Sequence, residues 1–201
     1  PPRSTLFPYT TLFRSLLRRA RELEAMGRDI IHMEIGEPDF PSPPPVVDAA
    51  TRFLARGDVH YTPALGIAPL REAIARFYQD RFGANVAPER IVVTPGASGA
   101  LMLALAATTN PGDTWLLPDP TYPSNRHLVR AFEGVARAVP VNADSAYQPT
   151  VAAVEAAWQA NTRGLIVASP ANPTGTLLTQ PEINALRQSV RARGEIGRAH
   201  V

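Results

Sequence analysis

The chain has 201 residues, 45% of them hydrophobic, which suffices for the core of a single domain. A formal net charge of +2 does not indicate nucleic acid or an anionic membrane as a partner, and the lack of cysteine excludes disulfides and thiolate metal sites. No apolar run approaches the roughly 20 residues of a membrane-spanning helix and no signal-peptide pattern is present, so we expect a cytoplasmic protein.

The two ends of the chain differ in pattern from the middle. Residues 3–15 read RSTLFPYTTLFRS, a near-repeat with neither helical nor strand period, and residues 195–201 read EIGRAHV. Both resemble translated sequencing-adapter DNA. We therefore interpret residues 1–15 and 195–201 as artefacts and leave them out of the fold prediction.

The first predicted elements are a helix, a strand and a turn-rich segment. Residues 16–26 have helical spacing and stop at Gly27, since glycine readily adopts the left-handed backbone that ends a helix. Residues 30–35 read as a short strand. Five prolines make residues 36–45 turn material.

A second helix is predicted before Gly83. Leu70, Ile74, Phe77 and Tyr78 recur at helical spacing and form one apolar stripe. We interpret this stripe as core, because an apolar helix face is normally buried against another element.

From residue 90 onward, strands and helices alternate regularly. The predicted strands are Ile91–Thr94, Thr114–Leu117, Ala136–Val141 and Leu165–Ala168. The predicted helices lie near 98–108, 122–133 and 150–159, and a last one starts at 180 behind a capping box of Thr179 and Glu182. Alternation of this kind implies right-handed βαβ units. We therefore predict an α/β fold of three α-β-α layers around a mainly parallel sheet.

The segment Val92–Leu101 runs from a predicted strand into a predicted helix. Its small residues let an anion approach the backbone and the helix N-terminus, and Ser98 adds a hydroxyl, so the segment suits a phosphate. A tight turn whose small residues serve packing is an equally good explanation. The glycine spacing is not a dinucleotide fingerprint, and the lysine of a Walker loop is missing, which argues against a nucleotide-binding domain.

Two further segments follow predicted strands. Tyr122 lies in Pro118–Pro123, where an aromatic ring can stack on a flat heteroaromatic ligand, although packing on the next helix is the more common role for such a tyrosine. Asn172 lies in Ser169–Gly175 and can donate a hydrogen bond to an oxyanion, although an Asn-Pro pair is also a common turn former. In a parallel sheet, all such segments meet at the carboxyl edge of the strands, where a ligand crevice is expected.

The chain resembles the class I/II aminotransferases, which are fold-type-I pyridoxal-phosphate enzymes. The resemblance covers roughly residues 16–194 and is carried by five segments in the family's order. They are Ile35–Phe40 (IGEPDF), Tyr61–Gly66 (YTPALG), Gly96–Leu101 (GASGAL), Pro118–Pro123 (PDPTYP) and Ser169–Gly175 (SPANPTG). It implies an amino-acid-metabolising enzyme that transfers an amino group between an amino acid and a 2-oxo acid.

The resemblance implies a role for each matching position. The backbone of Gly96 and Ala97, with the Ser98 hydroxyl, would hold the phosphate of pyridoxal 5′-phosphate. Tyr122 would stack on the cofactor ring, and Asn172 would donate a hydrogen bond to its phenolic oxygen.

Two further positions concern the substrate and a second subunit. Gly36 would lie beside the substrate carboxylate, with Asn172 close by. Tyr61 would reach the cofactor phosphate of the partner subunit, which makes the expected enzyme a homodimer. By the same resemblance, residues 16–60 would form an N-terminal arm and the start of the small domain, and residues 61–194 part of the cofactor-binding large domain.

The chain contains no lysine, because all 20 of its cationic residues are arginine. In the family, the Schiff-base lysine, the aspartate beside the ring nitrogen and the arginine that grips the substrate carboxylate all follow the Asn-Pro-x-Gly motif. We therefore interpret the chain as an N-terminal fragment without catalytic residues, and we predict that it is inactive.

Alternative functions stay open at this level. Another fold-type-I enzyme, a C–S lyase or a synthase, would share the cofactor-binding segments. A non-catalytic aminotransferase-like effector domain would need an upstream DNA-binding domain, and only about one helix precedes Gly36.

Neither metal nor nucleic acid is expected as a ligand, and no membrane contact is expected. The four histidines are too scattered to indicate a metal site: His32, His60, His127 and His200. Arg126 and Arg130 are interpreted as a solvated helix face.

Overall fold

The computed structural model describes residues 8–33, 36, 38–57 and 59–193, with side chains from residue 15 onward. The chain forms two compact units, Pro1–Val93 and Thr94–Val201. They are called the N-terminal and the C-terminal unit below.

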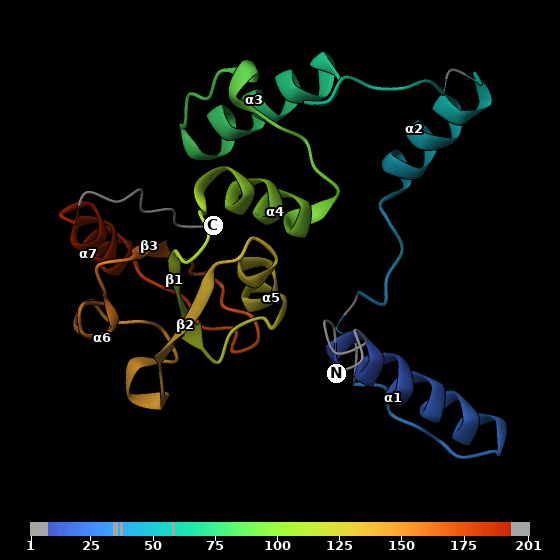
Figure 1. The fold of residues 1–201 in the computed structure, drawn as a ribbon. Helices are drawn as coiled ribbons and strands as arrows, with labels where there is room; N and C mark the ends of the chain where they lie inside the picture. Colours follow the sequence, from blue (N-terminus) through green and yellow to red (C-terminus); the bar gives the residue numbers. More distant parts are fainter. Residues whose placement is uncertain (1–7, 34–35, 37, 58, 194–201) are drawn as a thin grey trace. The chain divides into compact units, whose positions relative to one another are not determined.

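The N-terminal unit is built from helices in its described part (Figure 1). They are α1 (Pro8–Ala25), α2 (Pro44–Ala55), α3 (Ala68–Phe82) and the short 3₁₀ helix η2 (Pro88–Arg90). Helix α3 ends as predicted at Gly83, whose backbone is left-handed with φ 64° and whose N–H donates to the Gln79 carbonyl at 2.9 Å. Gly27 follows α1 with φ 81°, again as predicted.

Three predictions of secondary structure before helix α3 were wrong. Helix α1 begins at Pro8 rather than at residue 16, because the added residues extend an existing helix without a new nucleation step. Helix α2 starts within the segment predicted as turn, since proline is well tolerated in a first helical turn. Residues 30–33 form no strand, and residues 34–35 lie outside the described residues.

The apolar stripe of α3 is not buried. Leu70, Phe77 and Tyr78 are exposed, and Ile74 is half-buried. The helical period was therefore predicted correctly, but the interpretation as core was wrong. Phe77 and Tyr78 instead contact Phe82 within the helix surface, at ring-centroid distances of 5.8 and 5.7 Å.

The C-terminal unit is an α/β structure (Figure 1). Its elements are α4 (Gly96–Thr108), β1 (Thr114–Asp119), α5 (Ser124–Ala131), β2 (Val135–Pro140), the 3₁₀ helix η3 (Ala143–Ser145), α6 (Val151–Ala157), β3 (Thr162–Leu165) and α7 (Gln180–Arg191). The strands pair in the order β2-β1-β3, and both pairings are parallel. The predicted α/β class and parallel sheet are confirmed.

Two apolar clusters cover the two faces of this sheet. Leu116 points to one face, where Val139 and Leu165 join residues of α6 and α7 in a buried cluster. Trp115 and Leu117 point to the other face and pack with helices α4 and α5. Figure 1 shows α6 and α7 on one side of the strands and α5 on the other. The three-layer prediction is therefore confirmed for this unit.

The predicted strand Ile91–Thr94 is absent from the described sheet. A strand needs a neighbour with which it exchanges hydrogen bonds along a ladder. The Val93 N–H donates instead to the Leu65 carbonyl at 3.0 Å, a single contact within the N-terminal unit. Strands β1 and β2 match the predicted strands with ends shifted by one or two residues, whereas β3 (Thr162–Leu165) shares only Leu165 with the predicted strand Leu165–Ala168.

Candidate functional site

Two of the three predicted crevice segments leave the sheet at the same edge. Strands β1 and β3 run parallel, with Leu116 opposite Leu165, and the Ile166 N–H donates to the Leu116 carbonyl. The segments that follow β1 and β3 therefore emerge at the carboxyl edge, which is where ligands bind in open α/β sheets. These segments carry Tyr122 and Asn172.

The third segment forms the N-terminus of α4. Gly96 is left-handed with φ 73°, and an added Cβ would meet no atom within 4 Å, so the backbone angle and not space favours glycine there. The Thr94 carbonyl accepts from the Gly96 N–H at 2.8 Å, and the Thr94 hydroxyl donates to the Gly96 carbonyl at 2.9 Å. Thr94 thus fixes the turn into the helix.

The first turn of α4 is suited to an anion. No side chain caps it, and it contains no acidic residue. Its N–H groups have no partner within the helix, and the helix dipole adds positive potential there. Gly96, Ala97 and Ser98 are all exposed. The Gly96 N–H is occupied by the Thr94 carbonyl, which leaves the Ala97 and Ser98 N–H groups and the Ser98 hydroxyl for a ligand.

Tyr122 lies between the end of β1 and the start of α5. Its carbonyl accepts from the Asn125 N–H at 3.1 Å, and the buried Asn125 amide lies 3.5 Å from the Thr121 hydroxyl. These contacts fix the backbone, while Tyr122 as a whole remains 42% exposed. An aromatic face is thus available beside the sheet edge.

Asn172 lies in a closed loop after β3. The Ser169 hydroxyl accepts from the Leu178 N–H at 2.9 Å, and the Ala171 N–H donates to the Thr176 carbonyl at 2.8 Å. Gly175 takes φ 72° and donates to the Ala171 carbonyl at 2.7 Å. Asn172 itself is exposed, and its side chain makes no hydrogen bond to another described residue.

Gly36 and Tyr61 lie in the N-terminal unit. Both are exposed, and an added Cβ at Gly36 would meet no atom within 4 Å. Their predicted roles beside the substrate and the partner's cofactor stay predictions. So does the convergence of Ser98, Tyr122 and Asn172 on one ligand.

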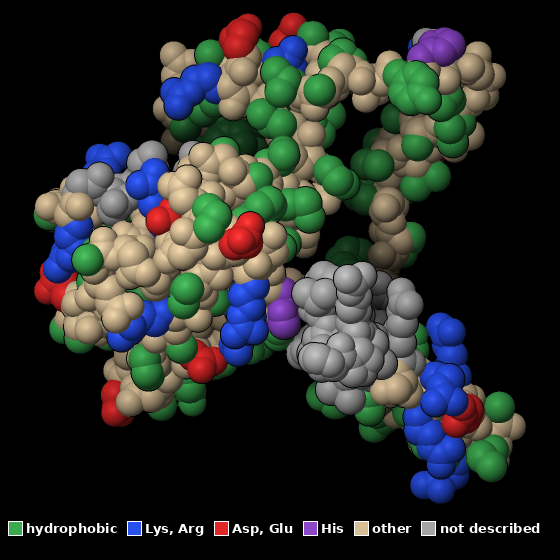
Figure 2. All heavy atoms as spheres, viewed as in Figure 1, with side chains coloured by type: hydrophobic (Ala, Val, Ile, Leu, Met, Phe, Trp, Pro, Cys, Tyr) green, Lys and Arg blue, Asp and Glu red, His purple; other side chains and the backbone are tan. Residues whose placement is uncertain are grey.

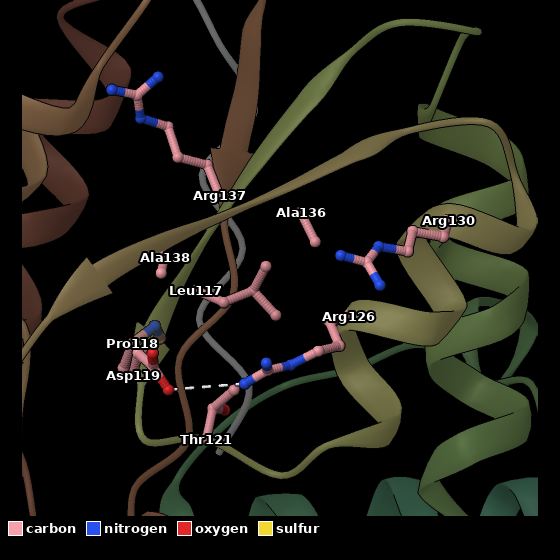
Figure 3. A pocket seen from close by; sticks show the side chains of 9 residues that line it. All are labelled: Leu117, Pro118, Asp119, Thr121, Arg126, Arg130, Ala136, Arg137 and Ala138. Atoms are coloured by element: carbon pink, nitrogen blue, oxygen red, sulfur yellow. Dashed lines mark hydrogen bonds and ion pairs between the residues drawn. The ribbon is translucent and has the colours of Figure 1, made fainter. Parts of the chain in front are cut away.

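A small pocket lies between α5 and the strands β1 and β2 (Figure 3). Its lining residues are Leu117, Pro118, Asp119, Thr121, Arg126, Arg130, Ala136, Arg137 and Ala138. Figure 3 shows Arg126 and Arg130 extending from α5 toward the pocket, whereas Arg137 extends away from them. Arg126 pairs with Asp119 at 3.5 Å, and both side chains remain about half exposed. None of Ser98, Tyr122 and Asn172 lines this pocket, although Pro118, Asp119 and Thr121 of the crevice segment after β1 do.

The described residues contain no group of three or more His, Asp or Glu that could hold a metal ion. Within the same residues, no helix is both long and apolar enough to cross a membrane.

Sequence reasoning missed one buried polar residue near the site. Gln148 follows η3 and donates from its amide to backbone carbonyls on both sides of the Asn172 loop. A lone glutamine in a loop carries no sequence signal for such a contact, because the acceptors are distant in the chain.

Comparison with known proteins gives a consistent result. A family profile described as "Aminotransferase class I and II" matches residues 28–196. A (5-formylfuran-3-yl)methyl phosphate transaminase of Methanocaldococcus jannaschii is 39% identical over 163 residues, which are 81% of this chain and 42% of that protein. An aspartate aminotransferase of Thermotoga maritima is 35% identical over 175 residues, which are 87% of this chain and 46% of that protein. The chain thus spans less than half the length of these two curated relatives.

Solved structures agree with the sequence matches. An aminotransferase from Mycobacterium tuberculosis superposes with a TM-score of 0.87 at 32% identity, covering 99% of this chain and 49% of that one. The aspartate aminotransferase from Thermus thermophilus with maleate also gives a TM-score of 0.87, at 33% identity, covering 93% of this chain and 49% of that one.

Proposed function

Because the chain belongs to the class I and II aminotransferase family, whose members depend on pyridoxal phosphate, we propose that it supplies the cofactor-binding part of an aminotransferase. The whole enzyme transfers an amino group between an amino acid and a 2-oxo acid. In the C-terminal unit, the observation that carries the proposal is the first turn of α4, which is exposed, has no side-chain cap and begins at the left-handed Gly96. The relatives matched above are named as transaminases, which favours this reaction over a lyase or a synthase.

The described residues fit the phosphate and the ring of the cofactor. Ala97 and Ser98 offer backbone N–H groups, and Ser98 a hydroxyl, to the phosphate. The exposed Tyr122 ring offers a stacking face, and the free Asn172 amide offers a donor to the phenolic oxygen. When bound, pyridoxal phosphate acts as an electron sink for the amino acid.

The remaining positions extend the proposal to substrate and partner. Gly36 lies beside the substrate carboxylate, and its missing side chain leaves room for that group. Tyr61 reaches the cofactor phosphate of a second subunit in a homodimer. Residues 16–60 belong to the arm and the small domain, residues 61–194 belong to the large domain, and residues 1–15 and 195–201 are adapter-derived.

The chain by itself does not catalyse transamination in this proposal. It has no lysine, so it offers no ε-amine for covalent attachment of the cofactor or for moving the substrate's α-proton. Its cofactor contacts are non-covalent, and the lysine belongs to the rest of the enzyme.

The test compares the 201-residue chain with the gene product that has natural ends. The longer protein should retain cofactor on a lysine after borohydride reduction, and it should exchange amino groups between an amino acid and a 2-oxo acid. The 201-residue chain should do neither. A longer protein that binds no pyridoxal phosphate would contradict the assignment, and turnover by the short chain would contradict the role of the missing lysine.

The non-covalent contacts are tested in the 201-residue chain by titration with pyridoxal phosphate, followed through fluorescence. Ser98→Ala should raise the dissociation constant by roughly ten- to a hundredfold, since a hydrogen bond to a charged group contributes about 1.5–3 kcal/mol. Ser124→Ala, a serine at the start of α5, is the matched control. Equal affinity of both variants would remove Ser98 from the proposed site.

A further inference from the structure

Gln148 is one of four polar side chains buried in the described part of the C-terminal unit, with 5% of its surface exposed. Its amide nitrogen donates to the Thr176 carbonyl at 2.9 Å and lies 3.4 Å from the Ala168 carbonyl. It also lies 3.3 Å from the Thr176 hydroxyl. Because both carbonyls are acceptors only, a donor is required at this position, and its loss would remove one hydrogen bond from each of these half-buried stems.

The two carbonyls that Gln148 joins belong to the two stems of the Asn172 loop. Ala168 precedes the loop, and Thr176 follows Asn172. The Thr176 carbonyl also accepts from the Ala171 N–H at 2.8 Å, which closes the loop. The same oxygen therefore accepts two hydrogen bonds, one from within the loop and one from the Gln148 amide. Gln148 is 20 and 28 residues away from these partners, so the bridge exists only in the folded unit.

The backbone that carries Gln148 is itself held in a defined turn. Asn142 and Ser145 exchange side-chain to backbone hydrogen bonds at the start of η3. Ala146 and Tyr147 then take left-handed φ angles of 49° and 54°, and the Gln148 N–H donates to the Ser145 carbonyl at 2.9 Å. Consecutive left-handed residues other than glycine persist only where surrounding contacts determine them. The turn therefore holds the Gln148 side chain against the Ala168 and Thr176 carbonyls.

We propose that Gln148 is a positioning residue for Asn172. The inference rests on the proposed function, in which the Asn172 amide contacts the cofactor ring. The Asn172 side chain has no hydrogen bond of its own in the described structure, so its location depends on the loop that carries it. Gln148 joins the two stems of that loop and thereby sets the direction of the Asn172 donor without touching the cofactor.

The first test measures amide hydrogen exchange in the 201-residue chain without cofactor. In Gln148→Met, which keeps the length and volume but cannot donate, exchange of the Ala171 and Gly175 amides should accelerate roughly tenfold, as for a lost buried hydrogen bond. The Ile166 amide in the sheet should keep its protection, which shows that the unit is folded. Unchanged Ala171 and Gly175 exchange would overturn the inference, since packing alone would then account for Gln148.

A second variant separates donation from packing. In Gln148→Glu the carboxylate faces carbonyl oxygens and the loop should open, whereas the protonated carboxyl regains an O–H donor and should restore protection at Ala171 on acidification. Burial raises the pKa of such a carboxyl, so recovery should begin above the usual glutamate range. Gln188→Glu on the exposed face of α7 is the matched control and should leave protection unchanged at every pH. Protection at Ala171 that does not respond to pH in Gln148→Glu would count against a donor role.

A third measurement distinguishes failure of this inference from failure of the proposed function. Pyridoxal-phosphate affinity is compared for the wild-type chain, Gln148→Met and Asn172→Ala. Weaker binding in both variants, with the loop loosened in Gln148→Met, supports the positioning role. Weaker binding in Asn172→Ala alone overturns it. Unchanged binding in Asn172→Ala removes Asn172 from the cofactor site, which is a failure of the proposed function and of the inference with it.

Discussion

The two units of the chain differ in what happens to their apolar side chains. In the C-terminal unit, Leu116, Val129 and Val139 are completely buried between the sheet and its helices. In the N-terminal unit, no described side chain from residue 15 to residue 93 is buried, and Phe53 and Phe77 are about half exposed. Figure 2 shows hydrophobic side chains over α2 and α3 as green spheres.

This difference separates amphipathicity from burial. The helical period of α3 decides which residues share a face, but a face is buried only when another element packs on it. In the C-terminal unit, the sheet supplies two opposing surfaces, and α5, α6 and α7 each cover part of one. The described helices of the N-terminal unit have no sheet to cover.

The largest expected contrast is in the stability lost when a leucine is replaced by alanine in each unit. Leu116→Ala removes a fully buried side chain from the centre of the sheet and should destabilise the C-terminal unit by about 2–5 kcal/mol. Leu54→Ala, at a leucine that is 66% exposed in α2, should change stability by less than about 0.5 kcal/mol. Urea unfolding followed by circular dichroism measures both, and equal losses would show that the N-terminal unit has a core of its own.

A second contrast adds a methyl group to a glycine instead of shortening a leucine. A Cβ at Gly164 in β3 would lie 2.7 Å from Cζ3 of the buried Trp115, so Gly164→Ala should cost about 1–3 kcal/mol through overpacking. Gly36→Ala meets no atom within 4 Å and should be nearly neutral for stability. The same unfolding experiment decides the matter: a neutral Gly164→Ala would mean that Trp115 readily moves aside.

A smaller contrast concerns the starts of the helices. Thr179 caps α7 by accepting from the Glu182 N–H, whereas Ile67 at the same position of α3 offers no side-chain cap. Thr179→Ala should therefore cost about 1 kcal/mol, and Thr179→Ser should keep most of the stability. A loss of similar size in both variants would show that the Thr179 methyl group, and not its hydroxyl, matters.

The smallest effect is a pH dependence of the same cap. The Thr179 hydroxyl, and then the Thr179 N–H, donate to the Glu182 carboxylate and lower the pKa of Glu182 below its ordinary value of 4.5. A carboxyl with a lowered folded pKa stabilises the fold above its ordinary value and loses that contribution as the pH falls through the folded pKa.

Exchange protection of the Thr179 amide should accordingly decline only below about pH 4.5. Glu182→Gln should remove the acid dependence and leave the rest of α7 unchanged. Protection that is constant through the acid range in the wild-type chain would mean that the carboxylate does not contribute to the cap.

The local features of the fold were predictable because their causes lie within a few residues. The reciprocal capping box of Thr179 and Glu182, the left-handed Gly83 at the end of α3 and the alternation of β1, α5 and β2 each depend on neighbouring side chains and backbone. The segments after β1 and β3 were likewise placed at the carboxyl edge once parallel strands were inferred. Family membership followed from five short segments in order.

The features that were missed depend on partners far along the chain. The strand predicted for Ile91–Thr94 needed a pairing neighbour, and the stripe containing Phe77 needed a covering surface; neither requirement can be read from the segment itself. Gln148 gained its role only when folding brought the Ala168 and Thr176 carbonyls to its amide.

The sequence by itself determined the helices of the C-terminal unit, its strands β1 and β2, and the residue types available for holding a phosphate and a ring, because short-range periodicity, caps and turn residues specify them. The absence of lysine also determined that this polypeptide cannot attach a cofactor covalently through an ε-amine. Only the tertiary structure decided the strand order β2-β1-β3, which apolar faces are buried, and the bridge from Gln148 to the Asn172 loop. Those outcomes depend on contacts between distant residues, whose free energy exists only once the chain has brought them together.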